Sequence, residues 1–306
     1  ILIDNIPYYK TKVVYAGIDF YRINNIRVKE QLFEMELYLW FKWKGDVDIE
    51  NISFINSIHT ESNRKVELKN DLKSEIKWAS YKVKSLFIHP FYLKKFPFDT
   101  QTIPLTLAHN FKDANSVQLV VDTGLQSQQE LKQIYPLEWR YIGREDFAGT
   151  YKINTSLGNS SYKNGDIQPD YSICQTNIIL KRLLTPYIYT FFLPLSIIIT
   201  VFLLVLFFPK DRFDATVTII VTALLCMLVF HSVAQDKIPS VGYLVKVDLY
   251  FILSYVFIIT LFVEYLTITL LERKKKNIIL EKIDRIFMIV YIPIVAIIYI
   301  LVTFLV

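Results

Sequence analysis

The stretch DRFDATVTIIVTALLCMLVFHSVAQDKIP (211–239) decides how the chain is built. At about 100° per residue of an α-helix, its polar side chains fall into one narrow stripe that apolar residues interrupt. The stripe consists of Asp214, Thr218, Thr222, Leu225, Val229, Ser232 and Asp236. Most of the remaining positions are apolar enough to face lipid. The stretch therefore predicts a membrane-spanning helix with a thin polar seam and a carboxylate at each end.

This seam has two interpretations. Hydroxyls and carboxylates in a membrane span usually face water or a polar partner, and a row of Thr and Ser suits the wall of a narrow aqueous pore. The alternative is a packing seam, because Thr and Ser also hold membrane helices together. The terminal carboxylates favour the pore, since a dry seam would have to pair or neutralise them.

The composition is typical of a chain that lies partly in a membrane. Of the 306 residues, 53% are hydrophobic, and the apolar runs are too long for a soluble domain. The net charge of +5 is uninformative about partners, because a local basic cluster at 273–276 contributes strongly to it. Such a cluster beside a span indicates a cytoplasmic connector and not a nucleic-acid site.

The two cysteines are not expected to pair, because Cys174 lies in the polar half and Cys226 in the middle of a membrane helix. An outer domain without an internal disulfide fits a bacterial protein better than a eukaryotic one. No signal peptide is visible at Ile1, so we expect that a leader has been removed or omitted.

Residues 1–183 have the pattern of strands. Alternating or β-rich runs include ELYLWFKWKGD (36–46), KWASYKVKSLFIH (77–89) and TIPLTLAHNF (102–111), separated by Gly, Asn, Asp and Pro. Many short strands without a convincing long amphipathic helix predict an immunoglobulin-like β-sandwich.

From residue 184 onward the chain becomes apolar. Four stretches are long enough to cross a bilayer, at about 184–208, 213–236, 243–271 and 286–306. The first and third connectors are basic, through Lys210, Arg212 and the cluster at 273–276, which predicts that they are cytoplasmic. Residues 184–306 are thus expected to form a four-helix transmembrane bundle, with the β-sandwich outside the cell or in the periplasm.

Several motifs occur in a meaningful order. FPFDTQ (96–101) has the pattern aromatic–Pro–aromatic–Asp–x–Gln, Arg182 precedes the first span, and Pro194 lies within it. The connector IPSVGYLVKVDLY (238–250) follows the second span. Together they resemble the pentameric ligand-gated ion channels, or Cys-loop receptor family. His89 and Ile103 stand where animal members have the bracketing cysteines, which is similar to bacterial members.

The resemblance implies a homopentamer in the bacterial inner membrane, in which each subunit has four identical partners. The second span of every copy would line a central pore, so that the stripe becomes a stack of rings. Leu225 and Val229 would form the hydrophobic gate. The acidic rings of Asp214 and Asp236 predict a channel for monovalent cations, because they concentrate cations and repel anions.

Coupling between a stimulus and the pore would involve the signature loop, by the same resemblance. Residues Phe96, Pro97, Phe98 and Asp99 would contact the connector that begins at Pro239. Asp99 is expected to pair with Arg182, and the turn at Lys29 and Glu30 would supply a second contact. A purely stabilising role for the pair remains an equal alternative.

An agonist pocket of aromatic side chains is also implied. The matching positions are Tyr38, Tyr81, Phe111, Tyr162 and Tyr171. Aromatic rings hold amines by cation–π attraction, but each residue has core packing as an equal alternative. Because vicinal cysteines are missing from the last loop, protons, small amines and divalent cations are all candidate agonists.

No cofactor is predicted, apart from a modulatory calcium ion. Asp46, Asp48, Asp113 and Asp122 offer carboxylates, although their spacing matches no calcium loop and solvated surface charge is the default. The sequence contains no nucleophile–base pair, phosphate loop or metal cluster, so an enzyme is not expected. The remaining alternatives are an anion-selective channel of the same family and a membrane ligand sensor without a pore.

Overall fold

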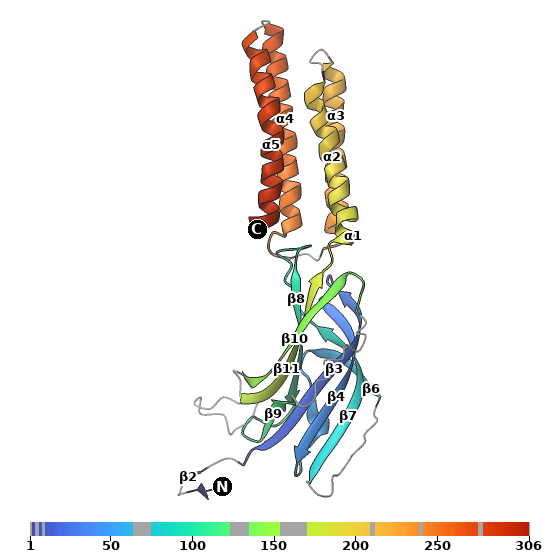
Figure 1. Ribbon diagram of the computed structural model, residues 1–306, viewed down its shortest axis with the longest axis vertical. Coiled ribbons are helices and arrows are strands. Elements are labelled where there is room, and N and C mark those ends of the chain that lie inside the picture. The colour runs from blue at the N-terminus through green and yellow to red at the C-terminus, as the bar shows by residue number, and fades with distance from the viewer. Residues whose placement is uncertain are drawn as a thin grey trace. The chain divides into compact units, whose positions relative to one another are not determined.

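The computed structural model describes residues 2–3, 6–7, 10–63, 75–122, 135–153, 170–208, 212–238, 241–274 and 278–305. The chain divides into two compact units (Figure 1). The first comprises Ile1–Phe91 and Thr100–Lys181, and the second comprises Tyr92–Asp99 and Arg182–Val306. The short segment Tyr92–Asp99 thus belongs with the helices, although strands of the first unit precede and follow it in the chain.

The first unit is a β-sandwich of two sheets. One sheet has the strand order β6-β7-β4-β3-β9 and the other has the order β10-β11-β8-β5. Strands β3, β4 and β7 pair antiparallel, whereas β9 runs parallel to β3. The bounds are β3 Lys12–Arg27, β4 Leu32–Lys44, β5 Ile52–Phe54, β6 Ser57–Asn63, β7 Ile76–Ile88, β8 Thr100–His109, β9 Val117–Val121, β10 Trp139–Lys152 and β11 Asp170–Arg182. A separate pair joins β1 (Leu2–Ile3) to β2 (Ile6–Pro7), and a short helix η1 (Ile49–Asn51) precedes β5.

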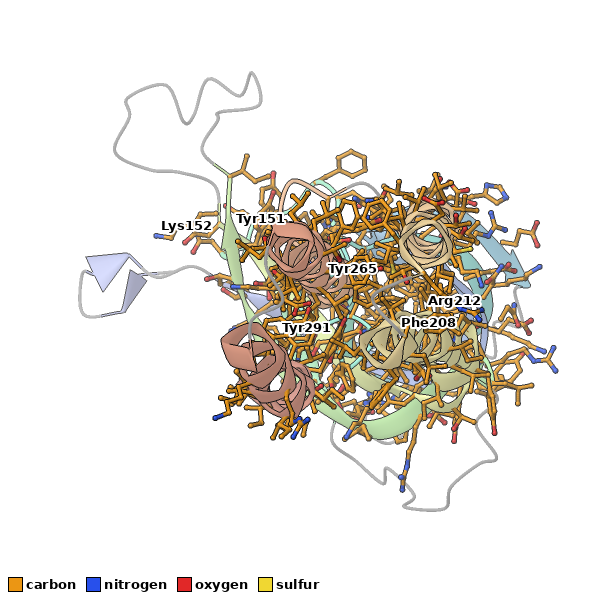
Figure 2. All side chains as sticks on the ribbon, turned by 90° about the horizontal axis from the view of Figure 1, so that it is seen from above. Tyr151, Lys152, Phe208, Arg212, Tyr265 and Tyr291 are labelled. Atoms are coloured by element: carbon orange, nitrogen blue, oxygen red, sulfur yellow. The ribbon has the colours of Figure 1, made fainter. Side chains whose placement is uncertain are left out.

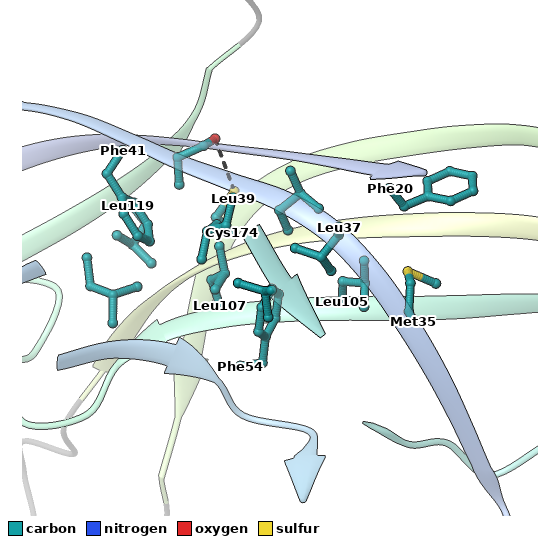
Figure 3. Close-up of a cluster of buried hydrophobic side chains, with 14 of the residues drawn as sticks. Phe20, Met35, Leu37, Leu39, Phe41, Phe54, Leu105, Leu107, Leu119 and Cys174 are labelled. Carbon is teal, nitrogen blue, oxygen red and sulfur yellow. Dashed lines mark hydrogen bonds between the residues drawn. The ribbon is translucent and has the colours of Figure 1, made fainter. Parts of the chain in front are cut away.

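The core lies between the two sheets. Along β4 every second residue from Phe33 to Trp43 is buried, as the two-residue period of a strand requires. These side chains meet Leu105 and Leu107 of β8 (Figure 3). Each fully buried aliphatic or aromatic side chain stabilises the fold by roughly 1.5–3 kcal/mol. Cys174 belongs to this core, where burial raises the pKa of its thiol to about 12.

The second unit contains helices that are long and apolar enough to cross a membrane. In the described part of the chain there are four such spans: Thr185–Phe207, Phe213–Gln235, Lys246–Leu271 and Arg285–Thr303. They are built from α1 (Thr185–Tyr187), η3 (Ile188–Phe192), α2 (Leu193–Leu203), η4 (Leu204–Phe207), α3 (Phe213–Gln235), α4 (Lys246–Lys274) and α5 (Ile278–Leu305). The predicted fold class, a β-sandwich followed by membrane-length helices, is confirmed, whereas a pentamer is not shown.

The first span changes its geometry just before Pro194. Residues Ile188–Phe192 form a π-helical turn, and α2 then begins with Leu193 and Pro194. Proline has no N–H to donate to the preceding turn, so a wider turn at this point accommodates the missing hydrogen bond. The side chain of Thr190 donates to the carbonyl of Pro186 over 2.8 Å.

Buried tyrosines lie among the helices, as seen along the helix axes in Figure 2. Tyr265 of α4 is 1% exposed and stacks on Phe213 of α3, with ring centroids 6.1 Å apart. Tyr291 of α5 donates a hydrogen bond to the carbonyl of Phe257 over 2.5 Å. These contacts link neighbouring helices by aromatic packing and hydrogen bonds. The side chains of the basic residues at 210 and 273–276 lie outside the described residues.

Candidate functional site

The polar stripe of α3 lies on the side of the helix opposite to its buried face. The helix packs against its neighbours with a face formed by Thr216, Ile220, Ala223, Met227 and Ala234. Every residue of the stripe is exposed instead: Asp214, Thr218, Thr222, Leu225, Val229, Ser232 and Asp236. The stripe covers only about 80° of the helix circumference, so these seven residues form one continuous exposed face.

The two threonine hydroxyls of this face are satisfied within the helix. Thr218 donates to the carbonyl of Asp214 and Thr222 donates to that of Thr218, each over 2.7 Å. Each hydroxyl oxygen can therefore accept a hydrogen bond from water or a passing ion's hydration shell without losing its own partner. This arrangement allows the face to be wet, and it does not require a polar partner on another helix.

The alternative that the two threonines pack against another helix also has support. Thr218 and Thr222 line a groove of about 310 Å³ between α3 and α2, together with Ile197 and Val201. Thr222 lies at the edge of the stripe that is nearest to this groove. Leu225 and Val229 are not part of the groove, and they are 57% and 65% exposed.

The carboxylates mark the two ends of α3. Asp214 lies in the first turn, although it does not cap the helix, because α3 begins at Phe213 and Arg212 has the capping position. A negative charge there is favoured by the helix dipole. Asp236 follows the last helical residue, where the dipole disfavours a carboxylate. The described chain therefore presents two exposed carboxylates about one helix length apart.

The signature segment forms a second cluster of predicted residues, within the helical unit. Asp99 accepts two hydrogen bonds from Arg182, from Nε over 2.7 Å and from Nη2 over 3.0 Å. The guanidinium also lies 4.8 Å from the ring centre of Phe96 and donates from Nη1 to the hydroxyl of Tyr187 over 3.0 Å. Burial by itself lowers the pKa of Arg182, but the hydrogen bond and charge of Asp99 outweigh it and raise this pKa.

The same segment contacts the connector before α4 and the first residue of α4. The amide of Leu93 donates to the hydroxyl of Tyr243 over 2.9 Å, and the amide of Lys246 donates to the carbonyl of Lys94 over 3.0 Å. The ammonium of Lys246 lies 5.0 Å from the ring centre of Phe98. The peptide bond between Phe96 and Pro97 is cis.

The other residues predicted to couple the stimulus to the pore do not belong to the cluster around Asp99 and Arg182. Lys29 and Glu30 lie in the turn between β3 and β4, where Glu30 pairs with Arg27 over 3.0 Å. Gln31 in this turn has φ of 59°, a left-handed conformation. Pro239 lies outside the described residues.

Of the predicted agonist aromatics, Tyr38 and Tyr81 lie on opposite faces of one sheet in the described part of the chain. Tyr38 pairs with Lys82 and Tyr81 pairs with Leu39, so the two tyrosines project from opposite faces of the same sheet. Tyr38 is 45% exposed, whereas Tyr81 lines a cavity of about 410 Å³ with Leu39. Phe111 is exposed after the end of β8, and Tyr171 lies at the start of the neighbouring strand β11. Tyr162 lies outside the described residues.

The acidic residues considered for calcium take part in separate local contacts. Asp113 accepts from the amide and hydroxyl of Ser116, and Asp122 accepts from Lys42 and Trp40. Asp48 accepts from Asn51, and Asp46 is exposed. The residues that the structure describes contain no group of three or more His, Cys, Asp or Glu side chains placed to hold a metal ion.

Sequence reasoning missed two tyrosines of the signature cluster. Tyr187 packs edge-on against Phe96, with ring centroids 5.1 Å apart, and Tyr243 packs against Tyr92 at 5.7 Å. Tyrosine at the polar end of a membrane span is a useful signal, because its ring is apolar and its hydroxyl needs a partner. With 20 tyrosines in the chain, that signal did not single these out.

Comparison with known proteins gives an informative similarity to an ion channel. No protein-family model matches the chain. Over 190 residues, which are 62% of this chain, it is 26% identical to pH-sensitive chloride channel 2 of Drosophila melanogaster. The matched region covers 35% of that protein, so the chain spans about a third of the length of its relative.

Proposed function

We propose that the chain is a subunit of a membrane ion channel whose pore is lined by α3. The observation that carries this proposal is the exposure of the whole polar stripe on the face opposite to the buried side of α3. In an isolated subunit that face would present carboxylates and hydroxyls to lipid, which is costly. Copies arranged around an axis turn it toward water, and the similarity to a channel supports the same arrangement.

The proposed assembly is a homopentamer, gated by a stimulus received in the β-sandwich. Leu225 and Val229 form the gate, because apolar rings expel water from a narrow pore. A stimulus would reach α3 through the segment Tyr92–Asp99, which contacts the chain just before α4. A bacterial cell membrane is the proposed location, in keeping with two free cysteines and no disulfide.

Anions are the first candidate for the permeant ion. The relative is a chloride channel, and this is the support that the comparison offers. Cations are the second candidate, which a specific observation favours. Asp214 and Asp236 are exposed at the ends of the stripe, and rings of carboxylates attract cations and repel anions.

Currents through the purified protein in planar bilayers with a potassium chloride gradient test both candidates. A reversal potential that approaches the chloride equilibrium potential establishes an anion channel, and one that approaches the potassium potential establishes a cation channel. The conductance of Asp214→Asn is a second measurement, because the two candidates predict changes in opposite directions. Removing the carboxylate ring raises anion conductance but lowers cation conductance. Asp236→Asn reports on the other end of the helix.

Protons are the first stimulus to test, because the relative is described as pH-sensitive. Amines and calcium follow, since the predicted aromatic and acidic residues would favour them. The rival proposal, a membrane sensor without a pore, predicts a monomer or dimer with no conductance. Native mass measurement in detergent together with bilayer recording separates it from a channel. Neither function requires enzymatic chemistry, and the similarity is to a channel.

A further inference from the structure

A cavity of about 810 Å³ lies in the first unit, and none of its lining residues belongs to α3 or to the signature segment. It is formed where β3 begins and β4 ends, and it extends to Ile76 of β7 and to Asp122 after β9. Its volume falls within the range of about 300–1,000 Å³ that small-molecule sites usually have. All its lining residues belong to the first unit and to the described part of the chain.

Apolar side chains that face solvent form one part of the wall. Val13, Tyr15 and Ile76 are 38%, 48% and 43% exposed. An apolar surface that is contiguous and rimmed by polar residues is typical of ligand-binding grooves. Tyr15 is directly paired with Lys42 across β3 and β4, and Ile76 is paired with Lys44 across β4 and β7. Each of these two apolar side chains therefore has a lysine directly beside it.

The charged part of the wall is mainly cationic. Lys10, Lys12, Lys42 and Lys44 line the cavity, against the aspartates Asp46 and Asp122. Lys42 pairs with Asp122 over 2.6 Å, and Asp122 also accepts from the indole of Trp40 over 2.8 Å. Lys44 pairs with Glu75 over 2.9 Å.

Two of these lysines form no ion pair with the residues that the structure describes. Lys12 donates to the backbone carbonyl of Asp46, which is neutral. Lys10 makes no ion pair with any residue that the structure describes. Trp43 also lines the cavity, and its buried Nε1 has no acceptor among the described residues. In the described part of the chain, the cavity therefore combines an apolar wall with two lysines that have no carboxylate partner.

We propose that this cavity binds an amphipathic organic anion, namely a carboxylate carried on an aromatic or short aliphatic body. Tyr15, Val13 and Ile76 would cover the apolar body, and Lys10 and Lys12 would hold the carboxylate. A lysine ammonium is a flexible point charge that suits an acid entering from solvent. A calcium ion does not fit here, because four lysines repel it and Asp122 is already held by Lys42 and Trp40.

Binding to the full chain in detergent tests the proposal without any need for ion conduction. The probe is 3-phenylpropanoate, compared with the uncharged 3-phenylpropanol and the cationic 3-phenylpropylamine, by calorimetry and by tryptophan fluorescence. All the tryptophans lie in the first unit, and Trp43 lines the cavity. We expect the acid to bind at least about tenfold more tightly than the alcohol, and the amine not to bind, because charge-assisted hydrogen bonds select the anion.

Two variants locate the site. The double change Lys10→Gln and Lys12→Gln weakens binding of the acid by about tenfold and leaves the alcohol unaffected, because only charge is removed. Tyr15→Ser weakens both, because it removes apolar contact. Lys181→Gln, an exposed lysine of β11, is the matched control and leaves binding unchanged.

Equal affinities for acid and alcohol would overturn the proposal, as would acid binding that the lysine changes do not affect. So would an absence of saturable binding. If the lysine changes instead alter the oligomeric state and no acid binds, the face is covered by a second copy of the chain, and the small-molecule site does not exist.

Discussion

Arg182 and Asp99 form a two-point ion pair that is almost completely buried, with side chains 2% and 3% exposed. Both oxygens of the carboxylate are engaged, at 2.7 Å and 3.0 Å. Taking both charges out of water is expensive, so the pair itself is weak support for high stability. Removing one partner is different, because the other charge stays buried without compensation.

Asp99→Asn should therefore destabilise the helical unit by about 3–5 kcal/mol, since it leaves the guanidinium buried beside a neutral group. Thermal unfolding of the purified full chain measures the loss. The matched control is Arg27→Gln, which breaks the exposed pair with Glu30 and should cost less than about 1 kcal/mol. A melting temperature of Asp99→Asn equal to that of the unchanged protein would refute the expectation.

Leu225→Ser should favour the open, wetted state of the channel. The change removes an exposed apolar side chain from every copy. Transfer of such a side chain out of water is favourable by roughly 1.5–3 kcal/mol, so its loss weakens the tendency of the gate to expel water. Bilayer recordings should show a resting leak and a lower stimulus for half-activation, by about tenfold. Leu301→Ser is the matched control, because Leu301 is 45% exposed on α5 and off the stripe. Unchanged activation without a leak would remove Leu225 from the gate.

Lys246 binds the C-terminal end of α5. Its ammonium donates to the carbonyl of Thr303 over 2.7 Å, in the last turn of the helix, and Tyr250 bonds the Thr303 hydroxyl over 2.8 Å. A cation at a helix C-terminus satisfies carbonyls that have no partner in the helix. Lys246→Met should thus loosen this end by about 0.5–2 kcal/mol.

Hydrogen exchange of the amides near residue 303 measures this loosening, which should appear as faster exchange confined to the last turns of α5. The control Lys282→Met changes an exposed lysine near the other end of the same helix and should leave those amides unaffected. Faster exchange throughout α5 in Lys246→Met would indicate general unfolding, and unchanged exchange would show that the lysine is dispensable.

Periodicity determines which residues share a face wherever a single regular helix or strand is concerned. The stripe from Asp214 to Asp236 could be found from spacing alone, because a regular helix fixes which residues share a face. The relative placement of the aromatic residues considered for an agonist could not be found in this way, since Tyr38 and Tyr81 lie on different strands and only their register places them on opposite faces. The contact between Leu93 and Tyr243 joins residues 150 positions apart, and no local pattern predicts it.

His109 makes the stability of the first unit depend on pH. Its Nδ1 accepts hydrogen bonds from the amides of Phe111 and Lys112, each over 3.1 Å, so the folded state requires an unprotonated Nδ1. Burial lowers the pKa of His109, the positive charge of Lys112 lowers it further, and the negative charge of Asp48 opposes both.

Because this pKa is lower in the folded state, the unfolded chain binds the proton first as the pH falls. The contribution of His109 to the free energy of unfolding should thus be constant above the ordinary histidine pKa of about 6.5, and should decrease below it until the folded-state pKa is reached. Urea unfolding followed by tryptophan fluorescence measures this first unit alone, since Trp40, Trp43, Trp78 and Trp139 all belong to it.

His109→Gln should reduce this pH dependence, because glutamine accepts hydrogen bonds but does not titrate. Part of the slope should remain, since burial also lowers the pKa of His89, and His89→Gln in the same chain should remove that part. His59→Gln is the control, because His59 is exposed on β6 with its side chain 73% accessible. If His59→Gln flattens the profile as much as His109→Gln, the buried imidazole is not the source of the acid sensitivity.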